Sequence, residues 1–403
     1  MDKKIVVTGL GVISSIGIGK DDFWKSLING TSGISEVTLF DTSKFKRNKA
    51  GQIKNFKSSD FIPREMVKFL GRASQFAIAA AKLALKDAKI TESKVKDKKS
   101  AVIIGTTMAE ARVYDVSSKM FVGEGWDDIT TKLMLNIFSS SIPRNLGHIL
   151  KAKGSNLLIP NACAAANYAL GYGFDLIKRG EVDLAIVGGV DSLSRVAFQG
   201  FQRLYAMAPD KCSPFDKDRK GMILGEGAGI LILESLESAL KRKAPIYSQV
   251  LGYGVSCDAH HMTIPKKEGI IKAMEKTLKN SNLSNKDIGY ISAHGTGTQA
   301  NDKAEAGAIN EIFEGRKVPV SSIKSMLGHC MGAASGLEAI ACCLALKEGV
   351  IPPTINFETS DSECDIDCIP NKARKGNFKI ALNNGFAFGG NNGCVAFSIM
   401  NNQ

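Results

Sequence analysis

Short apolar runs that alternate with longer helical patterns are the feature of this sequence that most constrains its fold. Many of the runs are rich in Val, Ile and Leu without polar alternation, as in strands that are covered on both faces. They lie at residues 4–8, 101–105, 156–160, 183–188, 228–233, 288–293, 378–383 and 394–399. Helical patterns lie between them, at residues 72–88, 164–179, 268–280 and 331–347. This alternation predicts an α/β fold built from layers, with mixed sheets.

The length of the chain predicts two structural units. At 403 residues, it exceeds the usual size of a single hydrophobic core. We expect two halves, residues 1–245 and 246–403, because the second repeats the strand and helix style of the first. No sequence repeat proves a duplication, and no linker rich in Pro, Gly or Ser separates the halves, so we expect one compact body. The pattern at 331–347 is apolar nearly all round, which predicts a buried helix.

Charge and cysteine content indicate which cellular compartment and which class of binding partner to expect. The net charge of +12 fits an acidic protein partner, an anionic substrate or merely solvated lysines. Nucleic acid is not expected, because no nucleic-acid motif accompanies the lysines. The nine cysteines are scattered, which indicates reduced thiols, and Cys364 and Cys368 lack the further ligands of a structural zinc site.

The N-terminal apolar run, residues 5–16, is broken by glycines and has no cleavage site, so it predicts a strand followed by a glycine-rich turn. No run of about 18 apolar residues predicts a membrane-spanning helix. We therefore expect a cytoplasmic protein without membrane insertion.

The segment NLLIPNACAAANYALGYGFDLI, residues 156–177, is the first candidate site. Its apolar strand ends in a sharp turn, and Cys163 is followed at once by an alanine-rich helix. The helix dipole and the free N–H groups at this end favour a thiolate, and the small neighbouring side chains leave room for a substrate. A buried, inert cysteine fits the segment equally well, since that is the common fate of a free cysteine.

Two later loops each place a histidine after a strand. His294 lies in a Gly/Thr loop that leads into a helix, with Asp302 and Glu305 as local hydrogen-bond acceptors. Lys324 and His329 lie between a short strand and the apolar helix, where a lysine must find a carboxylate or lose its charge. Structural roles stay open here, namely a satisfied loop histidine for His294 and an exposed loop tip for Lys324.

The segment NNGFAFGGNNGCVAFSIM, residues 383–400, alternates phenylalanine with glycine and alanine before a last strand. Such a loop can present backbone N–H groups to an oxyanion while an aromatic ring moves as a gate. Taken alone, the segment is no more than a flexible turn.

Together these segments indicate a protein family far more specifically than any one of them does. Cys163, His294 and His329 each follow a strand, in a loop of small residues. With PFDKDRKGMILGEGAGILILE (214–234) and DAHHMTIP (258–265), the chain resembles the β-ketoacyl synthases of fatty-acid and polyketide synthesis over essentially its whole length. The resemblance implies the thiolase fold, two pseudo-symmetric halves in a five-layer αβαβα arrangement, and a homodimer.

A Cys–His–His set implies an elongating synthase that works with acyl carrier protein, because initiating synthases carry Cys–His–Asn and thiolases carry Cys–His–Cys. Cys163 then holds the acyl group, and His294 and His329 stabilise the enolate formed when malonyl-acyl carrier protein loses CO2. The backbone N–H groups of Cys163 and Phe388 form the oxyanion hole, and the Phe388 ring is the gate. No organic cofactor is implied.

Other matching positions imply supporting roles. Lys324 and Glu305 form a buried charged network that supports the histidines. Met108 and Phe386 line the acyl pocket. A structural monovalent cation is implied near Glu338 and Asn384, and the carrier protein is expected to dock at Lys68, Arg72 and Arg203.

Several positions depart from the pattern of the housekeeping enzymes. Tyr168 stands where a histidine is usual, Ala387 replaces the glycine between the two gate phenylalanines, and residues 188–204 look closer to synthases of specialised pathways. We therefore expect an unusual acyl chain, such as one of a polyene or an unusual lipid. The alternatives are a decarboxylase or acyltransferase that has lost condensation, a subunit that shapes chain length in a heterodimer, and a cysteine hydrolase.

Overall fold

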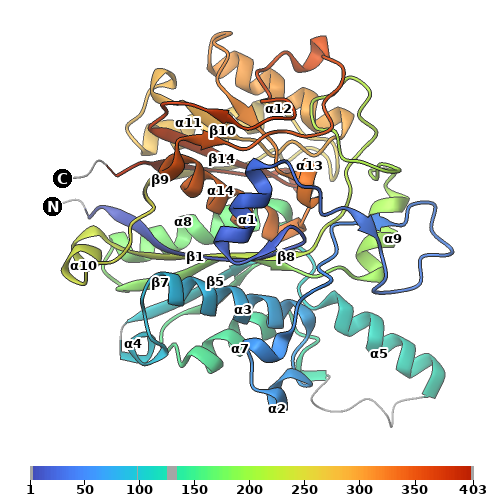
Figure 1. Ribbon diagram of the computed structural model, residues 1–403, viewed down its shortest axis with the longest axis vertical. Coiled ribbons are helices and arrows are strands. Elements are labelled where there is room, and N and C mark those ends of the chain that lie inside the picture. Colours follow the sequence, from blue (N-terminus) through green and yellow to red (C-terminus); the bar gives the residue numbers. More distant parts are fainter. Residues whose placement is uncertain (1–2, 98, 125–133, 401–403) are drawn as a thin grey trace.

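The computed structural model describes residues 3–97, 99–124 and 134–400, and they form five stacked layers. In Figure 1, helices lie at the bottom, then strands, then a central pair of helices, then strands, and helices again at the top. The three helical layers hold, from bottom to top, α3 (Arg72–Asp87) with α7 (Ser141–Leu150), α8 (Ala165–Lys178) with α14 (Ala334–Glu348), and α11 (Lys267–Asn280) with α12 (Gln299–Ile312). The predicted αβαβα arrangement is confirmed.

The strands pair in the same way in both halves. The first half contributes β1 (Ile5–Ser14), β5 (Ser100–Gly105), β6 (Asn156–Ile159), β7 (Leu184–Asp191) and β8 (Gly227–Ser235). The second contributes β9 (Ser248–Cys257), β10 (Tyr290–Ser292), β11 (Val320–Ser321), β14 (Ile380–Phe386) and β15 (Asn391–Ser398). The order β6-β5-β7-β8-β1 is repeated as β11-β10-β14-β15-β9, with two parallel pairings followed by two antiparallel ones each time. The pairing therefore supplies the pseudo-symmetry that no sequence repeat revealed.

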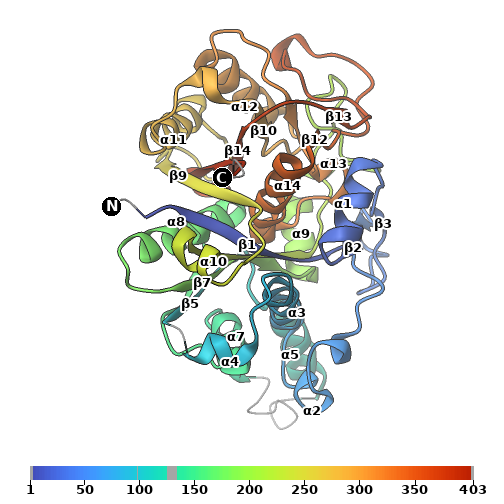
Figure 2. The same ribbon diagram turned by 60° about the vertical axis from the view of Figure 1, so that its left-hand side comes forward.

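A short antiparallel pairing between β1 and β9 joins the two halves. The central helices then lie between the two groups of strands, as the turned view in Figure 2 also shows. α8 packs against β5 and β7 on one side and against β9 and β15 on the other, and α14 packs against β8 and β14. Because both faces of α14 are covered, all its residues from Ala334 to Leu346 are buried, as its all-round apolar sequence predicted.

Glycines in β1 and β9 let the outer helices lie close to the sheet. A Cβ atom at Gly11 would lie 1.8 Å from the Ala80 carbonyl oxygen of α3, and one at Gly254 would lie 2.3 Å from the Ala273 carbonyl oxygen of α11. The expectation of a glycine-rich turn after residue 8 was wrong for this reason, because Gly9 and Gly11 continue the strand to Ser14.

The shorter elements complete the layers and carry the loops around the site. In the first half they are β2 (Gly17–Ile18), α1 (Lys20–Ile28), β3 (Ser35–Glu36), β4 (Lys49–Ala50), η1 (Ser58–Asp60), α2 (Arg64–Val67), α4 (Glu92–Asp97), α5 (Ala111–Glu124), η2 (Ala162–Ala164), α9 (Arg195–Arg203) and α10 (Leu236–Lys241). In the second half they are η3 (Asn285–Asp287), α13 (Lys324–Leu327), η4 (Met331–Ala333), β12 (Val350–Ile351), η5 (Ser362–Cys364), β13 (Arg374–Lys375) and η6 (Phe388–Gly390). The predicted boundary after residue 245 lies between α10 and β9, and the division into two units there stays a prediction. Within the described residues, no helix is long and apolar enough to cross a bilayer.

Candidate active site

Cys163 lies at the turn between β6 and α8. The strand ends at Ile159, and the 3-10 turn η2 carries the thiol just ahead of the helix. Ala162 has a φ angle of 46°, a left-handed conformation that costs an alanine roughly 1–2 kcal/mol. This strained turn directs the nearly buried thiol of Cys163, whose residue is 5% exposed, into the molecule rather than toward solvent.

His329 lies in the corresponding place in the second half, between β11 and α14. Its residue is buried, and the N–H group of Met331 donates to Nδ1 of its ring at 3.1 Å. An Nδ1 atom that accepts a hydrogen bond carries no proton, so the neutral ring bears its proton on Nε2. His329 is therefore oriented as a hydrogen-bond donor through Nε2.

His294 follows β10 in a loop that two buried carboxylates hold. Oε1 and Oε2 of Glu305 accept the N–H groups of His294 and Gly295, each at 2.8 Å. Asp302 accepts the N–H groups of Thr296 and Gly297. The expectation that both carboxylates serve as local acceptors is confirmed. Nδ1 of His294 has no hydrogen-bond partner within the described parts of the chain, so its tautomer is not fixed.

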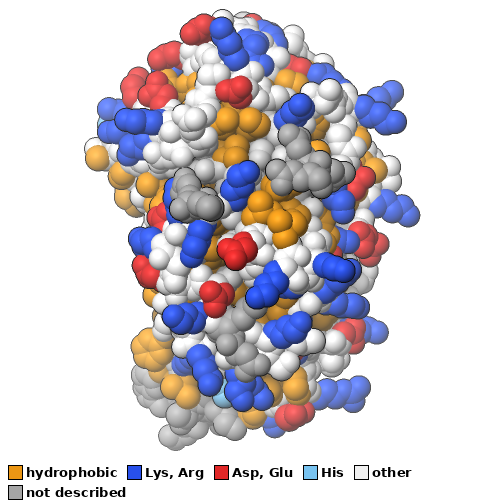
Figure 3. Space-filling view, turned by 90° about the vertical axis from the view of Figure 1, so that its left-hand side faces the viewer, with side chains coloured by type: hydrophobic (Ala, Val, Ile, Leu, Met, Phe, Trp, Pro, Cys, Tyr) orange, Lys and Arg blue, Asp and Glu red, His pale blue; other side chains and the backbone are white. Residues whose placement is uncertain are grey.

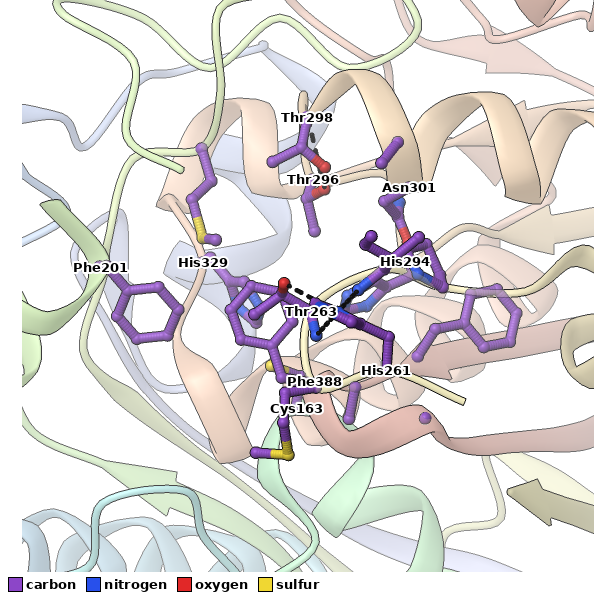
Figure 4. A pocket seen from close by; sticks show the side chains of 18 residues that line it. Cys163, Phe201, His261, Thr263, His294, Thr296, Thr298, Asn301, His329 and Phe388 are labelled. Atoms are coloured by element: carbon purple, nitrogen blue, oxygen red, sulfur yellow. Dashed lines mark hydrogen bonds between the residues drawn. The ribbon is translucent and has the colours of Figure 1, made fainter. Parts of the chain in front are cut away.

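The three predicted residues converge. Sγ of Cys163 and one ring nitrogen each of His294 and His329 all lie within 4.8 Å of one another. The two rings meet edge to face, with centroids 5.3 Å apart, and Figure 4 shows both beside Cys163 and Phe388. A thiol and two imidazoles can bind zinc, or they can form a nucleophile with two hydrogen-bond donors. The charges and backbone groups around them distinguish the two arrangements.

Burial dominates the protonation of this cluster. It raises the pKa of the Cys163 thiol to about 12, against the opposing effects of Lys324 and of the backbone N–H groups of Phe388 and Cys163. The thiolate that the helix end was expected to favour is therefore not the resting state. Burial also lowers the pKa of His294 and of His329 well below the ordinary value, and the positive charge of Lys324 lowers both further. Both rings are neutral at pH 7.

Lys324 forms the buried ion pair of the site. Its Nζ atom pairs with Oε1 of Glu338 and donates to the carbonyl oxygen of His294 at 2.6 Å. The predicted network of Lys324 with Glu305 needs correction, because Glu305 instead accepts backbone N–H groups and the Nδ2 group of Asn384. An unpaired lysine with 1% exposed surface would be very costly, and Glu338 supplies the required charge.

A narrow pocket of about 50 Å³ leads to the thiol. Its walls include Phe201 of α9, Phe386 and the turn at Phe388, and the Phe201 and Phe388 rings stack with centroids 5.9 Å apart. A pocket of this size holds only a few water molecules, so a longer acyl chain enters only if a wall side chain moves. The backbone N–H groups of Phe388 and Cys163 lower the pKa of the thiol against the effect of burial, so donors suited to an oxyanion hole lie near the sulfur. The positive charge of Lys324 acts on all three groups and disfavours a divalent cation there. The oxyanion hole itself stays a prediction.

Comparison with known proteins agrees with this geometry. Residues 2–239 match the family model described as "Beta-ketoacyl synthase, N-terminal domain", and residues 247–358 match the corresponding C-terminal domain. The chain belongs to the β-ketoacyl synthase family. It is 38% identical to "3-oxoacyl-[acyl-carrier-protein] synthase 2" of Synechocystis sp., with 98% of each chain covered. It is 36% identical to the chloroplastic synthase I of Arabidopsis thaliana, covering 98% of this chain and 86% of the relative.

Solved structures extend the similarity. "The ishigamide ketosynthase/chain length factor" superposes with a TM-score of 0.97 at 42% identity, and all of each chain is covered. The AntDE:AntF structure, described as a type II polyketide synthase acyl-carrier protein in complex with its ketosynthase, gives a TM-score of 0.91 at 30% identity over 99% of this chain and 100% of that one. The fold of this β-ketoacyl synthase is thus the thiolase fold, and the protein is a condensing enzyme of the acyltransferase type.

The residues predicted to shape the acyl pocket of the synthase lie at different depths. Phe386 lines the pocket at the thiol, with its ring 5.9 Å from that of His294. Met108 packs in the same apolar cluster as Phe388 and Phe201, but it borders a separate hollow along α5. Its role as a limit on the acyl chain stays a prediction.

The structure offers acceptors for the implied cation. Oε2 of Glu338 and Oδ1 of Asn384 are buried and have no hydrogen-bond partner among the described residues. Carboxylate and amide oxygens are the ligands that hard cations prefer. Glu338 shares its other oxygen with the Lys324 ammonium group, and the monovalent cation stays a prediction.

The predicted docking residues differ in their freedom to bind a partner. Lys68 and Arg203 are exposed, at the ends of α2 and α9. Arg72 is not free, because its guanidinium donates to both carboxylate oxygens of the buried Glu226, at 2.9 and 2.6 Å, and lies over the ring of Phe76. The docking prediction for Arg72 conflicts with these contacts.

Sequence reasoning missed other residues at the pocket. Phe201, His261 and Thr296 line it from three separate segments, and only the fold brings them together. Tyr168, which stands where a histidine is usual, donates its hydroxyl to the carbonyl oxygen of Asn392 at 3.2 Å. Ala387 has an extended backbone, with φ of −127°, so no glycine is needed between the two phenylalanines.

Proposed function

We propose that this synthase transfers an acyl group from a carrier protein to Cys163 and condenses it with a malonyl thioester, with loss of CO2. The observation that carries the proposal is the convergence of one thiol and two neutral imidazoles within 4.8 Å, beside the backbone N–H groups of Phe388 and Cys163.

Acyl transfer requires the thiol proton to leave, because burial keeps Cys163 protonated. His294 can accept that proton, since its ring is neutral and its Nδ1 atom has no hydrogen-bond partner among the described residues. Because its pKa lies well below the ordinary value, the proton must move together with the attack of the sulfur on the thioester rather than before it. The sulfur attacks the thioester carbon, the oxyanion accepts the N–H groups of Phe388 and Cys163, and the carrier thiolate leaves with the proton from His294. The acyl group is then held as a thioester of Cys163.

Condensation follows when a malonyl thioester occupies the same pocket. Its carboxylate carbon leaves as CO2, and the electron pair of the broken C–C bond forms an enolate whose oxygen accepts hydrogen bonds from His294 and His329. Each such donor typically contributes about 3 kcal/mol of barrier lowering. The enolate carbon attacks the acyl carbonyl carbon and the Cys163 thiolate leaves, which gives a β-ketoacyl product two carbons longer.

Intact-mass and product analysis with acyl- and malonyl-carrier proteins tests the proposal. Wild type is expected to show an acyl adduct that turns over to a β-ketoacyl product. Cys163→Ala should show neither, yet should still release CO2, because its histidines are intact. Release of CO2 by wild type without adduct or longer product would instead indicate a decarboxylase or a helper subunit, and the proposal would fall.

A specialised pathway is the second candidate, with the same chemistry on a different chain. The similarity to the ishigamide ketosynthase/chain length factor, at 42% identity, favours it over the 38% found with a fatty-acid relative. Retention of Cys163, His294 and His329 argues against a role as a chain-length subunit alone. A panel of saturated and polyunsaturated acyl carriers separates the two, because preference for ordinary saturated chains would count against a specialised role.

The proposed partner is an acidic acyl carrier protein, with Lys68 and Arg203 as docking residues. On the face shown in Figure 3, which lies opposite α9 in Figure 1, Lys and Arg side chains are scattered with acidic side chains between them, rather than gathered in one patch. Because the proposed carrier protein is acidic, charge reversal of Lys68 or Arg203 should slow carrier binding without affecting small thioester substrates. We propose that the enzyme works in the cytoplasm, where reduced thiols such as Cys163 persist.

A homodimer is the proposed assembly. Among the strands that the structure describes, β6 pairs only with β5 and ends the sheet, and Leu157 on this strand is 37% exposed. An open, apolar edge strand is a favourable surface for pairing with a second copy. Leu157→Lys should shift the molar mass measured by light scattering toward the monomer.

A monovalent cation is proposed at Glu338 and Asn384, where it would neutralise the unpaired oxygens beside the His294 loop. Replacing potassium with a bulky organic cation should lower the melting temperature of wild type, and Asn384→Leu should remove that difference.

A further inference from the structure

Asp191, the last residue of β7, is a fully buried carboxylate held by four donors. Oδ1 accepts the Thr106 hydroxyl and the Met108 N–H group, each at 2.8 Å. Oδ2 accepts the N–H groups of Thr107 at 2.7 Å and Gly332 at 2.6 Å. No lysine or arginine in the described part of the chain forms an ion pair with it, so hydrogen bonds alone compensate its charge.

The four donors belong to two turns that lie far apart in the sequence. Thr106 to Met108 form the turn after β5, which carries the predicted acyl-pocket residue. Gly332 lies in η4, directly after Met331, whose N–H group fixes the ring of His329. The turns also pack against each other, because a Cβ atom on Gly332 would lie 2.5 Å from Thr106 backbone atoms.

We propose that Asp191 is a positioning residue that links the turn at residues 106–108 to the turn η4 beside His329. Its carboxylate then fixes both the position of Met108 and the orientation of the His329 ring. The inference rests on the proposed condensation, since it concerns the same pocket. It assigns Asp191 no contact with substrate.

An ionised carboxylate is required for this role. Protonation or amidation of either oxygen would place a hydrogen against an N–H donor, because both oxygens accept a backbone N–H group. Burial raises the pKa of Asp191 to about 6, so the group is still ionised at pH 7. A buried carboxylate without a cation destabilises the fold relative to an apolar residue, which argues that its hydrogen bonds serve the site.

Glu110 supplies a matched control. It is also a buried carboxylate near the same turn, and it also accepts two backbone N–H groups, those of Ala73 and Ser74 at the start of α3. It has no hydrogen bond to η4 in the described structure. Glu110→Gln should therefore lower the free energy of unfolding, as Asp191→Asn does, without changing the orientation of the His329 ring.

The test compares Asp191→Asn, Glu110→Gln and wild type in decarboxylation of malonyl-carrier protein, after circular dichroism has shown that each is folded. Asp191→Asn should lower the rate about tenfold or more, and Glu110→Gln should leave it nearly unchanged. In a His329→Ala background, Asp191→Asn should have no further effect, because it acts through that ring. Equal losses in the two carboxylate variants, or a full additional loss without His329, would overturn the proposal.

Thr106→Val is a milder variant that keeps the test decisive if Asp191→Asn fails to fold. It removes one donor to Asp191 on the Met108 side, together with the acceptor of the Ala109 N–H group, and leaves the bond from Gly332. Its acylation profile over acyl chains of increasing length should shift while decarboxylation stays at the wild-type level. An unchanged profile, or loss of both activities together, would contradict the two-sided role.

A substrate-free readout separates this proposal from the proposed function. The Cys163 thiol lies within 4.8 Å of ring nitrogens of His294 and His329. The positive charge of Lys324 lowers the pKa of the thiol and the negative charge of Asp191 raises it, so Asp191 opposes thiolate formation. Asp191→Asn should therefore move alkylation of Cys163 by iodoacetamide to lower pH, and Glu110→Gln should not. If Asp191→Asn shifts the pH of alkylation but wild type does not catalyse condensation, only the proposed function is overturned. If wild type catalyses condensation but Asp191→Asn does not shift the pH of alkylation, the proposed role of Asp191 is overturned.

Discussion

The two turns that precede the central helices have one backbone design and opposite chemical content. Ala162 and Met331 both adopt a left-handed conformation, with φ of 46° and 52°, and each opens a 3-10 turn that leads into a central helix. The next residue is Cys163 in the first half and Gly332 in the second. One half thus presents a thiol at this position, and the other presents a bare N–H group to Asp191.

The difference shows how two halves with the same backbone arrangement can supply different chemical groups to one reaction. The first turn is surrounded by alanines and supplies the reacting atom. The second is surrounded by buried charge, with Lys324 paired to Glu338, and supplies the hydrogen-bond donor His329. A side chain in place of Gly332 would meet the backbone of Thr106 and Thr107, so the second turn cannot carry a second nucleophile without displacing the first half.

The largest expected effect is on stability, from loss of the buried ion pair between Lys324 and Glu338 beside the second turn. Lys324→Met should lower the free energy of unfolding by about 3–5 kcal/mol, because Glu338 would be left buried and unpaired. Urea denaturation measures the change, and Lys324→Met combined with Glu338→Leu should recover much of it. The exposed pair of Lys267 and Glu311 is the control, and Lys267→Met should change stability little. A similar loss at both pairs would mean that burial is not the cause.

Removal of the donor on the second turn should separate the two half-reactions. His329→Ala should lower decarboxylation of malonyl-carrier protein by about 10²–10³-fold, because the enolate oxygen loses a hydrogen bond. Acylation of Cys163, followed by intact mass, should fall far less. If His329→Ala abolished both steps equally, the proposed division of work between the turns would be wrong.

Gly332→Ala tests the steric limit on the second turn. The added methyl group would lie 2.5 Å from Thr106 backbone atoms, and overpacking of this kind costs about 1–3 kcal/mol of unfolding free energy. Gly200→Ala is a matched control, because a Cβ atom there has nothing within 4 Å and the residue lies in α9. Thermal unfolding of both variants checks the contrast, and equal melting temperatures would refute the close packing of the turns.

The smallest effect concerns the first turn and its thiol. With a pKa of about 12, the thiolate fraction of Cys163 should rise about tenfold per pH unit between pH 7 and 9, without a plateau. Alkylation by iodoacetamide, followed by mass in a Cys257→Ser background that removes the exposed thiol, measures this. A plateau near pH 7 would show that Lys324 and the helix end outweigh burial.

The sequence predicted the elements with the strongest apolar patterns. All the strand segments named from the sequence are strands in the structure, and α14 is as buried as its composition required. β9 was not predicted, because Gly252 and Gly254 interrupt its apolar residues to admit α11. Within the site, Cys163, His294 and His329 could be identified because each follows a strand in a small-residue loop.

The supporting contacts could not be predicted, since they join residues with no regular spacing. Lys324 meets Glu338 across the start of α14, whereas the family pattern suggested Glu305 as its partner. Arg72 seemed a surface cation until the fold brought it onto Glu226. Asp191 had no local signal, because its four donors come from residues 106–108 and from Gly332, on the other side of the molecule's pseudo-symmetry.

The central position of α8 has a consequence for how the protein is made. One face of this helix packs on β5 and β7, and the other packs on β9 and β15. β15 spans residues 391–398, so it is synthesised last. A ribosome therefore synthesises more than two hundred residues after α8 before the second cover exists. During that interval an apolar surface is open to chaperones or to other nascent chains. We expect chains that stop before β15 to be recovered as aggregates rather than as a folded first half.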